Sequence, residues 1–456
     1  MSTRTLCACA VMLLAASSFA ATQNKLQNRP QQNRARETAR AKFTSLRQKV
    51  EKANLQKDIL GARKALLGLH ALAPGHSATT YNLACMNALA GRRAEALHWL
   101  DMFVRMGQVA DAAKDPDLAS IAGDKSFLKL MERMKANRAA VERGSTWTTL
   151  DGAGLLAEDI TYDRKTRSFF VTSLLAKKVL RIDKDKKVSE FADLSKDPGW
   201  PVFAVALQSG TNPALWVAAA ALPDFSASPN AEWGKTALLK LDMESGRILE
   251  RFEPAPDGAV RVLGDIAVSD GGTVVVSDGH SGGVYLLNSG ERQMKGIDSD
   301  EFISPQTPAF DRDALSVFVA DYVRGIGRID LRSGRVTWLT HDDSVATAEI
   351  DGLYLHGDQL IAVQNGRGVQ RIVSLALNAS HTAIKGAEVL AANSEAFADP
   401  THGVLVDDAF YYLSHSGWDG LDRNGNAKAG AALPRPSVRI VNVAEPAAPP
   451  RQAVKR

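Results

Sequence analysis

The stretch Gly264-Asp265-Ile266-Ala267-Val268, followed closely by Val274-Val275-Val276-Ser277-Asp278, decides the fold of this 456-residue chain. Two short alternating runs around a glycine turn are typical of paired β-strands. Related openings recur through the last two-thirds of the sequence, beginning near Glu158, Phe203, Gln306, Asp351 and Thr401. Successive openings are roughly 40–60 residues apart, the period of a four-stranded propeller blade. Six copies therefore predict a mainly β chain with a six-bladed β-propeller over residues 145–443.

The segment Trp147-Thr148-Thr149-Leu150 lies just before the first copy. We expect it to supply the outer strand of the last blade, because that pairing closes the ring and removes open sheet edges. Blades two and six carry insertions after their second strands, at Ala221–Gly234 and His415–Pro434. Their tryptophans, Trp233 and Trp418, are candidate ligand contacts, since loops on a rigid scaffold often carry recognition. The alternative interpretation is that the two insertions arose by sequence drift and have no role in recognition.

The first twenty residues have the pattern of a secretory signal peptide. Arg4 precedes an apolar run over residues 10–16, and Ser18-Phe19-Ala20 matches a cleavage site. The run is shorter than the ~20 residues that cross a bilayer. We therefore expect residues 1–20 to be removed, the protein to be periplasmic or secreted, and no transmembrane segment to remain. Cys85 would then be the one cysteine, which excludes an intramolecular disulfide.

The net charge of +4 conceals an asymmetry between the two parts of the chain. Residues 1–145 hold 23 Lys and Arg against 11 Asp and Glu, a net of +12, and the remainder has a net of −8. A solvated basic helical module explains this, and contact with an acidic surface such as a membrane is the alternative. Nucleic acid is not expected as a partner of an exported chain without interleaved aromatics. Residues 21–36 and 444–456 have the composition of a flexible lead-in and a disordered tail.

Residues 37–140 show helical periodicity and almost no strand pattern. Two helical hairpins are predicted, with helices at Ala41–Ala53, Asp58–Leu72, Ala78–Ala90 and Arg93–Met106. The small residues on their facing sides resemble tetratricopeptide repeats, which implies an all-α domain and a protein partner bound through the repeats. About three repeats are usually needed for stability. A pair should therefore pack against the next domain or against a partner.

One residue at the opening of each copy should point toward the propeller axis. These residues are Glu158, Phe203, Asp265, Gln306, Asp351 and His402 or its neighbour Thr401. Converging carboxylate and amide oxygens are what a hard divalent cation requires. The alternative is that the acids cap the turn into each strand by accepting backbone N–H bonds. For His402 the alternative to a metal ligand or base is a satisfied histidine in the channel lining. The channel itself is a site for a small-molecule ligand, with Phe203 and Asp265 as contacts.

At these positions the chain resembles the senescence marker protein, gluconolactonase and luciferin-regenerating enzyme family of six-bladed propellers, over residues 150–442. The resemblance implies that Glu158 and Asp351 match two acids that hold a divalent metal in that family. Gln306 stands where a third ligand, an Asn, is usual, and Asp265 stands where an Asn contacts substrate. Gln306 keeps a carbonyl oxygen, whereas Asp265 adds a negative charge and puts the family's substrate class in question.

The resemblance implies a metal-dependent hydrolase of lactones or related esters, with calcium as the expected ion and zinc as the alternative. Asp351 or Asp265 would then act as the general base, with His402 as a second base or ligand. A non-catalytic envelope protein, binding a ligand or a protein partner through the propeller and the helical repeats, is the alternative, because propellers host both kinds of function.

Overall fold

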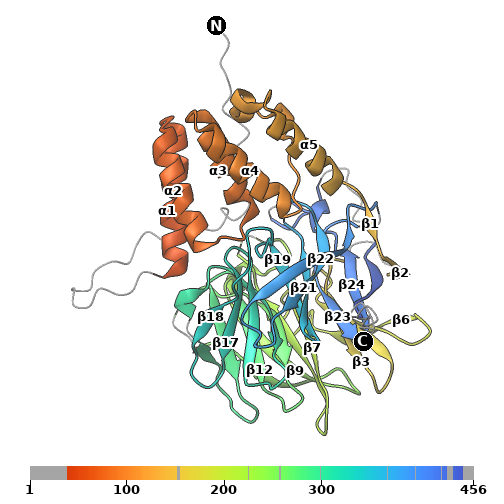
Figure 1. Cartoon of the computed structure of the whole chain (residues 1–456). Helices are drawn as coiled ribbons and strands as arrows, with labels where there is room; N and C mark the ends of the chain where they lie inside the picture. Colours follow the sequence, from red (N-terminus) through yellow and green to blue (C-terminus); the bar gives the residue numbers. More distant parts are fainter. Residues whose placement is uncertain are drawn as a thin grey trace, which may run out of the picture.

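The computed structural model describes residues 38–150, 155–223, 225–255, 258–297, 299–366, 368–395, 397–422, 424–428 and 435–444. The predicted signal peptide, the lead-in and nearly all of the predicted tail therefore lie outside the described residues. Two parts are visible in Figure 1, a group of helices and a ring of small β-sheets beneath it. The predicted fold class, a six-bladed propeller preceded by a smaller helical domain, is confirmed.

The helical domain consists of two antiparallel hairpins and one further helix. Its helices are α1 (Ala39–Leu55), α2 (Ile59–Leu72), α3 (Ser77–Leu89), α4 (Arg93–Arg105) and α5 (Lys125–Asn137), with short 3₁₀ turns η1 (Ala112–Lys114) and η2 (Pro116–Ile121). Side-chain caps begin several of them, because the first backbone N–H groups of a helix lack partners within it. Thr38 accepts from the Ala41 N–H and Asp58 accepts from the Gly61 N–H.

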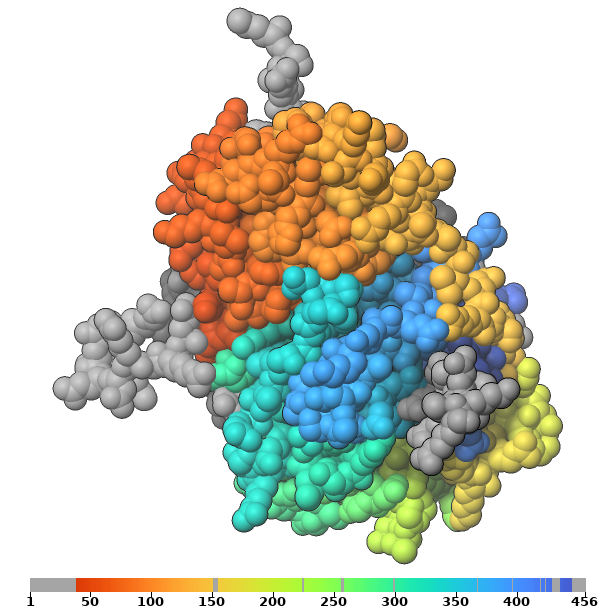
Figure 2. Space-filling view, viewed as in Figure 1, coloured from red at the N-terminus to blue at the C-terminus, as the bar shows by residue number. Residues whose placement is uncertain are grey.

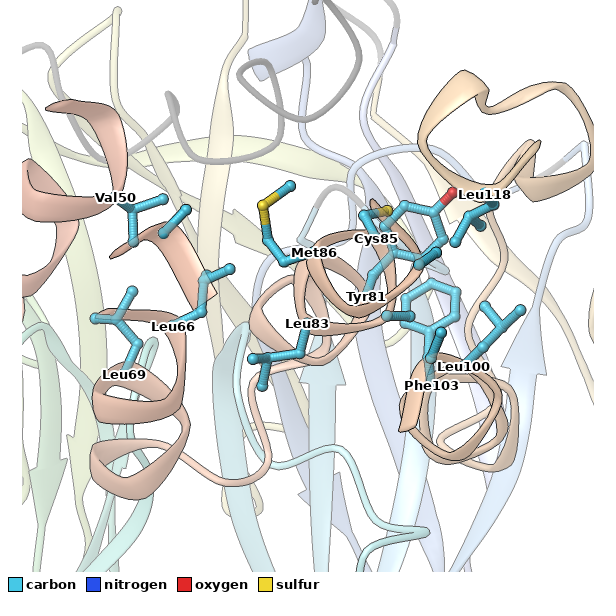
Figure 3. Packing of buried hydrophobic residues seen from close by; sticks show 14 of the residues in the cluster. Val50, Leu66, Leu69, Tyr81, Leu83, Cys85, Met86, Leu100, Phe103 and Leu118 are labelled. Atoms are coloured by element: carbon cyan, nitrogen blue, oxygen red, sulfur yellow. The ribbon is translucent and has the colours of Figure 1, made fainter. Parts of the chain in front are cut away.

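The core of the helical domain lies between α3, α4 and the η2 turn. Figure 3 shows Tyr81, Cys85, Leu100, Phe103 and Leu118 meeting there. All five side chains are buried, and Cys85 has no exposed surface. Cys85 is thus a packed core cysteine.

The propeller has six sheets, each with its first strand innermost. Blade 1 contains β3 (Ala157–Asp163), β4 (Ser168–Ser173), β5 (Lys178–Ile182) and β6 (Val188–Asp193). Blade 2 contains β7 (Val202–Gln208), β8 (Ala214–Ala220), β9 (Thr236–Asp242) and β10 (Ile248–Phe252), with η3 (Asn230–Glu232) in its insertion. Blade 3 contains β11 (Leu263–Val268), β12 (Val274–Asp278), β13 (Gly283–Leu287) and β14 (Lys295–Ile297).

The remaining blades follow the same order. Blade 4 contains β15 (Pro305–Phe310), β16 (Ser316–Asp321), β17 (Gly325–Asp330) and β18 (Val336–Trp338), preceded by η4 (Ser299–Glu301). Blade 5 contains β19 (Ile350–His356), β20 (Gln359–Gln364), β21 (Arg371–Leu377) and β22 (Ile384–Ala392). Blade 6 contains β23 (Gly403–Val406), β24 (Ala409–His415) and β25 (Ser437–Asn442), with η5 (Trp418–Gly420) in its insertion.

Two strands that precede the first blade complete the last two. β2 (Gly144–Thr149) pairs with β25 and supplies the fourth strand of blade 6, as the sequence predicted for this region. β1 (Val141–Glu142) pairs with β22 and gives blade 5 a fifth strand, which the sequence analysis did not predict. The β2–β25 pairing joins the two ends of the propeller chain within one blade and so closes the ring.

The helical domain packs against loops of blade 4. Ile303, before β15, and Val323, between β16 and β17, belong to the same buried apolar cluster as the helices. The Arg40 guanidinium also donates to the Ile303 carbonyl over 3.5 Å. Figure 2 shows the helices as one continuous mass resting on blades 4 and 5. The short helical array thus packs against the next domain.

Further contacts of the helical domain are made with the loops that follow β20 and β22 of blade 5. The Gln108 side chain accepts from the Val369 N–H at 3.2 Å, and the Asn393 side chain donates to the Asn137 carbonyl at 2.9 Å. The loops concerned start inner strands or join second to third strands, so they all lie at one end of the channel. The helical domain therefore covers part of the face where the inner strands begin. Among the helices that the structure describes, none is both long and apolar enough to cross a membrane.

Asp321, at the end of β16, holds the loops on which the helices rest. Its carboxylate accepts backbone N–H bonds from Ile303, Ser304, Val323 and Arg324 at 2.5–3.0 Å. Since Asp321 is fully buried, its removal would leave several buried donors unpaired.

We expect Asp321→Ala to lower the free energy of unfolding by about 2–4 kcal/mol. Asp330→Ala is the matched control, because Asp330 caps an exposed turn through Ser333 and should cost about 1 kcal/mol or less. Urea denaturation of both variants measures the difference. Equal losses would show that the Asp321 bonds are not what holds these loops.

Candidate functional site

Bulges at the start of the inner strands aim side chains at the channel axis. In five of the six blades the register of the inner strand shifts near its first residues, at Glu158 and Asp159, Phe203, Gly264, Gln306 and Thr307, and Asp351. A bulge adds an unpaired residue and turns its side chain away from the regular alternation. This local irregularity is why polar residues of distant blades meet in one place.

The polar residues form two layers. Glu158, Gln306 and Asp351 make up the outer layer. The inner layer lies further along the channel. It consists of Asp159, Asp265, Thr307 and His402, which also line the channel cavity. The sequence register placed Asp265 in one ring with Glu158 and Asp351. The structure places it deeper, because Gly264 occupies the bulge in blade 3.

His402 and Asp265 form a buried ion pair that spans the channel. His402 Nε2 lies 2.6 Å from Asp265 Oδ1, and His402 Nδ1 lies 2.9 Å from the Glu158 carbonyl oxygen. A carbonyl can only accept, so Nδ1 donates, and the carboxylate holds the second proton on Nε2. Burial alone would lower the pKa of His402, but Asp351 and Asp265 together raise it well above its usual value. The imidazole is therefore a cation with both nitrogens engaged.

Thr307 and Ser277 complete the surroundings of Asp265. The Thr307 hydroxyl lies 3.0 Å from Asp265 Oδ1 and 2.6 Å from the Asp351 carbonyl oxygen, and the Ser277 hydroxyl lies 3.3 Å from Asp265 Oδ2. Asp265 is thus a well-satisfied carboxylate that orients His402.

Glu158 and Asp351 are placed differently, since each keeps one oxygen available. Glu158 Oε2 accepts from the Trp418 indole at 2.5 Å, and Asp351 Oδ2 accepts from the Asn365 amide at 2.7 Å. For the other oxygen of each carboxylate, no donor is recorded among the residues that the structure describes. Ligand atoms of Glu158, Asp351 and His402 lie within 4.8 Å of one another.

Ionisation of the outer carboxyl groups is disfavoured in the metal-free protein. Burial is the main cause that raises the pKa of Glu158 well above its usual value, and burial likewise raises the pKa of Asp351 to about 7. His402 opposes both shifts, and the neighbouring acids add to them. A bound cation would remove this penalty, because it favours the ionised carboxylates. The oxygen donors of Glu158 and Asp351 therefore fit a divalent metal.

Turn capping, the alternative interpretation of the ring acids, holds for Asp159. Its two oxygens accept the Ile160 and Val205 backbone N–H groups at 2.7 and 2.8 Å. Burial raises the pKa of Asp159 to about 6. The structure thus separates the acids by role, with Asp159 joining blades 1 and 2.

The other residues predicted for the site have different surroundings. The Gln306 amide donates to the Ser304 carbonyl and hydroxyl at 3.3 and 3.1 Å, and for its carbonyl oxygen no partner is recorded among the residues that the structure describes. Phe203 is buried in an apolar cluster beneath the two insertions. Trp233 is 38% exposed and makes no recorded contact with the described part of the site.

The insertions of blades 2 and 6 join over blade 1. The Ser226 N–H donates to the Asn424 carbonyl at 2.7 Å, and its hydroxyl donates to the Gly425 carbonyl at 3.0 Å. Phe225 packs beside Trp418, with ring centroids 6.1 Å apart. Trp418 therefore holds Glu158 as part of a packed cover.

Asn365 is a site residue that the sequence analysis missed. It follows β20 directly, and its side-chain oxygen accepts from the Tyr322 hydroxyl at 3.1 Å while its amide holds Asp351. Its position at the end of a second strand, on the same face as the ring residues, was the available signal.

A cavity of about 290 Å³ lies along the channel below the inner layer. Asp159, Asp265 and His402 form its polar end, and residues such as Leu207 and Phe310 line it further along the inner strands. Glu158 and Asp351 do not line this cavity. The ion pair of His402 and Asp265 thus separates the channel from the outer carboxylates.

Comparison with known proteins gives structural neighbours only. No family model matches the sequence, and no curated protein matches it either. The structure is similar to a luciferin-regenerating enzyme (14% identity, 67% of this chain and 96% of that chain, TM-score 0.47). It is also similar to a gluconolactonase from Xanthomonas campestris (11%, 67% and 97%, 0.44) and to a PQQ-bound aldose sugar dehydrogenase from Streptomyces coelicolor (14%, 66% and 100%, 0.44). At this identity the likeness concerns the fold.

The raised pKa of Asp351 predicts a pH dependence of stability. Its folded pKa of about 7 exceeds the unfolded value of about 3.9, so the folded protein binds the proton more tightly. Stability should therefore fall as the pH rises from about 4 to 7. In metal-free protein, we expect wild type to lose roughly 1–3 kcal/mol relative to Asp351→Asn between pH 5 and pH 8. Denaturation curves at both pH values measure this, and parallel curves would contradict it.

Proposed function

We propose that this protein is an exported, divalent-metal-dependent hydrolase of lactones or related small esters. The observation that carries the proposal is the pair of half-buried outer carboxylates, Glu158 and Asp351, each with one available oxygen, beside the cationic His402. Export rests on the signal-peptide pattern of residues 1–20, and the mass of the mature protein tests it.

Glu158 and Asp351 would hold the metal, which when bound polarises an ester carbonyl and lowers the pKa of a water molecule. Calcium suits the site better than zinc. Zinc prefers imidazole or thiolate ligands in a tetrahedral set, whereas both nitrogens of His402 are already hydrogen-bonded. Calcium accepts carboxylate oxygens with water and substrate completing six to eight ligands.

The side chains divide the remaining chemistry. Asp351 would take a proton from water beside the metal, and Asn365 fixes its orientation. His402 is doubly protonated and therefore does not serve as a base. It presents positive charge where an oxyanion would form, and Asp265 keeps it in that state.

A non-catalytic binding protein is the second candidate function. The observation that favours it is the enclosure of the carboxylates, because the insertions of blades 2 and 6 and the helical domain all cover the face where Glu158 and Asp351 lie. In this case the cation would stabilise the covered arrangement, and the exposed surface would bind a ligand or protein partner.

Metal binding is the first test. We expect stoichiometric calcium in protein purified with calcium, with Glu158→Gln and Asp351→Asn each weakening binding roughly tenfold or more in calorimetry. Asp330→Asn, at an exposed turn of blade 4, is the control, and its affinity should stay close to that of wild type. The metal site would be refuted if the purified protein contained no metal and its melting temperature did not change on addition of calcium or of a chelator.

Hydrolysis of a panel of lactones and aryl esters separates the two functions. We expect calcium-dependent turnover that falls at least about 100-fold in Asp351→Asn. Asp265→Asn should lower kcat with less effect on calcium affinity, because Asp265 acts through His402. Calcium binding without turnover on any ester would favour the binding protein.

A further inference from the structure

The end of the helical domain farthest from the propeller exposes large apolar side chains. Of the seven large hydrophobic residues recorded as exposed, four lie in this domain: Leu55 (87%), Leu60 (64%), Leu89 (36%) and Leu128 (54%). Such side chains in a soluble domain are usually scattered, whereas contiguous ones mark interaction surfaces.

The course of the helices places these leucines at one end. α1 starts at the propeller, where Arg40 contacts Ile303, and α4 and α5 end there through Gln108 and Asn137. The α2–α3 connection also faces the propeller, since a side chain on Gly75 would collide with Thr347. The α1–α2 turn, the α3–α4 turn and the start of α5 must therefore lie at the opposite end, as Figure 1 shows.

An ion pair ties two of these far ends together. Arg93, after the α3–α4 turn, pairs with Asp124, the residue that caps α5. Leu89 and Leu128 are accordingly on neighbouring parts of the same surface. Leu55 and Leu60 flank the α1–α2 turn next to them.

Exposed lysines lie close to these leucines along the chain, together with Asp58 of the α1–α2 turn. Lys52, Lys57, Lys64, Lys125 and Lys129 are exposed, and none of them has a recorded ion pair among the described residues. Residues 38–145, which include the helical domain, hold 18 Lys and Arg against 10 Asp and Glu, a net charge of +8. We call the four leucines and these five lysines the distal surface.

We propose that the distal surface docks on a membrane that contains anionic phospholipids. Leucines at separate turn tips can each enter the region between headgroups and acyl chains, while long lysine side chains reach lipid phosphates. A membrane fits this arrangement better than a protein, because the leucines stand near the ends of separate helices with exposed lysines close to them along the chain. Lysine near an anionic membrane adds attraction that salt weakens.

This docking is independent of the proposed hydrolysis. It concerns the end of the helices opposite to the loops of blades 4 and 5, so the carboxylates of the site are not part of it. With that orientation the helical domain would stand between the membrane and the propeller.

The test uses full-length mature protein and lipid vesicles. Vesicles of phosphatidylcholine with about one-third phosphatidylglycerol should bind the protein in a flotation assay, and binding should weaken at least tenfold as salt rises from about 50 to 500 mM. Vesicles of phosphatidylcholine alone should bind at least tenfold more weakly. The double variant Leu55→Ser/Leu60→Ser should lose at least tenfold in affinity for the anionic vesicles, and Lys52→Glu/Lys57→Glu should do the same.

The propeller supplies a matched control. Leu249 and Leu315 are 53% and 67% exposed but lie in blades 2 and 4, so Leu249→Ser/Leu315→Ser should leave binding unchanged. Unchanged circular dichroism melts would show that all three variants fold. No binding of wild type to anionic vesicles at low salt would overturn the proposal. Equal losses in the distal and control variants would also overturn it. So would distal variants that lose binding to a soluble protein partner but still bind anionic vesicles as wild type does.

Discussion

The pairing of β2 with β25 is the interaction on which the rest of the structure depends. It closes the ring, and a ring of blades is what brings six inner strands to one axis. Because β2 directly follows the helical domain, the same pairing anchors α5 beside blades 5 and 6, and the β1–β22 pairing reinforces it. A strand that joins the two ends of the propeller therefore also fixes the position of the helices over the channel. Fold closure and coverage of the site are consequences of one stretch of chain.

Closure makes the strands converge, but regular strands would not direct the acids to the axis. The bulges do so, at Glu158 and Asp351 above all. Carboxylates gathered in this way are unfavourable in a buried setting unless they are paired or hydrogen-bonded. The protein satisfies Asp159 with backbone donors and Asp265 with His402, and it leaves Glu158 and Asp351 each half satisfied. That difference, more than the presence of acids, is why we propose the outer pair as the place for a cation.

The sequence was sufficient for the propeller, because the repeat around Gly264 has the period of a blade and a clear strand alternation. It also located the closing strand near Trp147. It did not show the depth of each ring residue, since a bulge shifts register by one residue without changing composition. It could not identify Asn365 or the bond from Trp418 to Glu158 either. Each contact joins two elements whose relative position in space depends on how the folded ring packs.

The half-satisfied carboxylates also connect the site to its cover. Glu158 is held by Trp418, which packs on Phe225 in the other insertion. Asp351 is held by Asn365, which bonds Tyr322, the neighbour of a residue in the helical core. A cation that binds the carboxylates in this arrangement more tightly than in an opened one stabilises the cover by the same free energy. By reciprocity, contacts that hold the cover in place strengthen cation binding. Cation binding by Glu158 and Asp351 and closure of the cover over them would therefore be thermodynamically coupled.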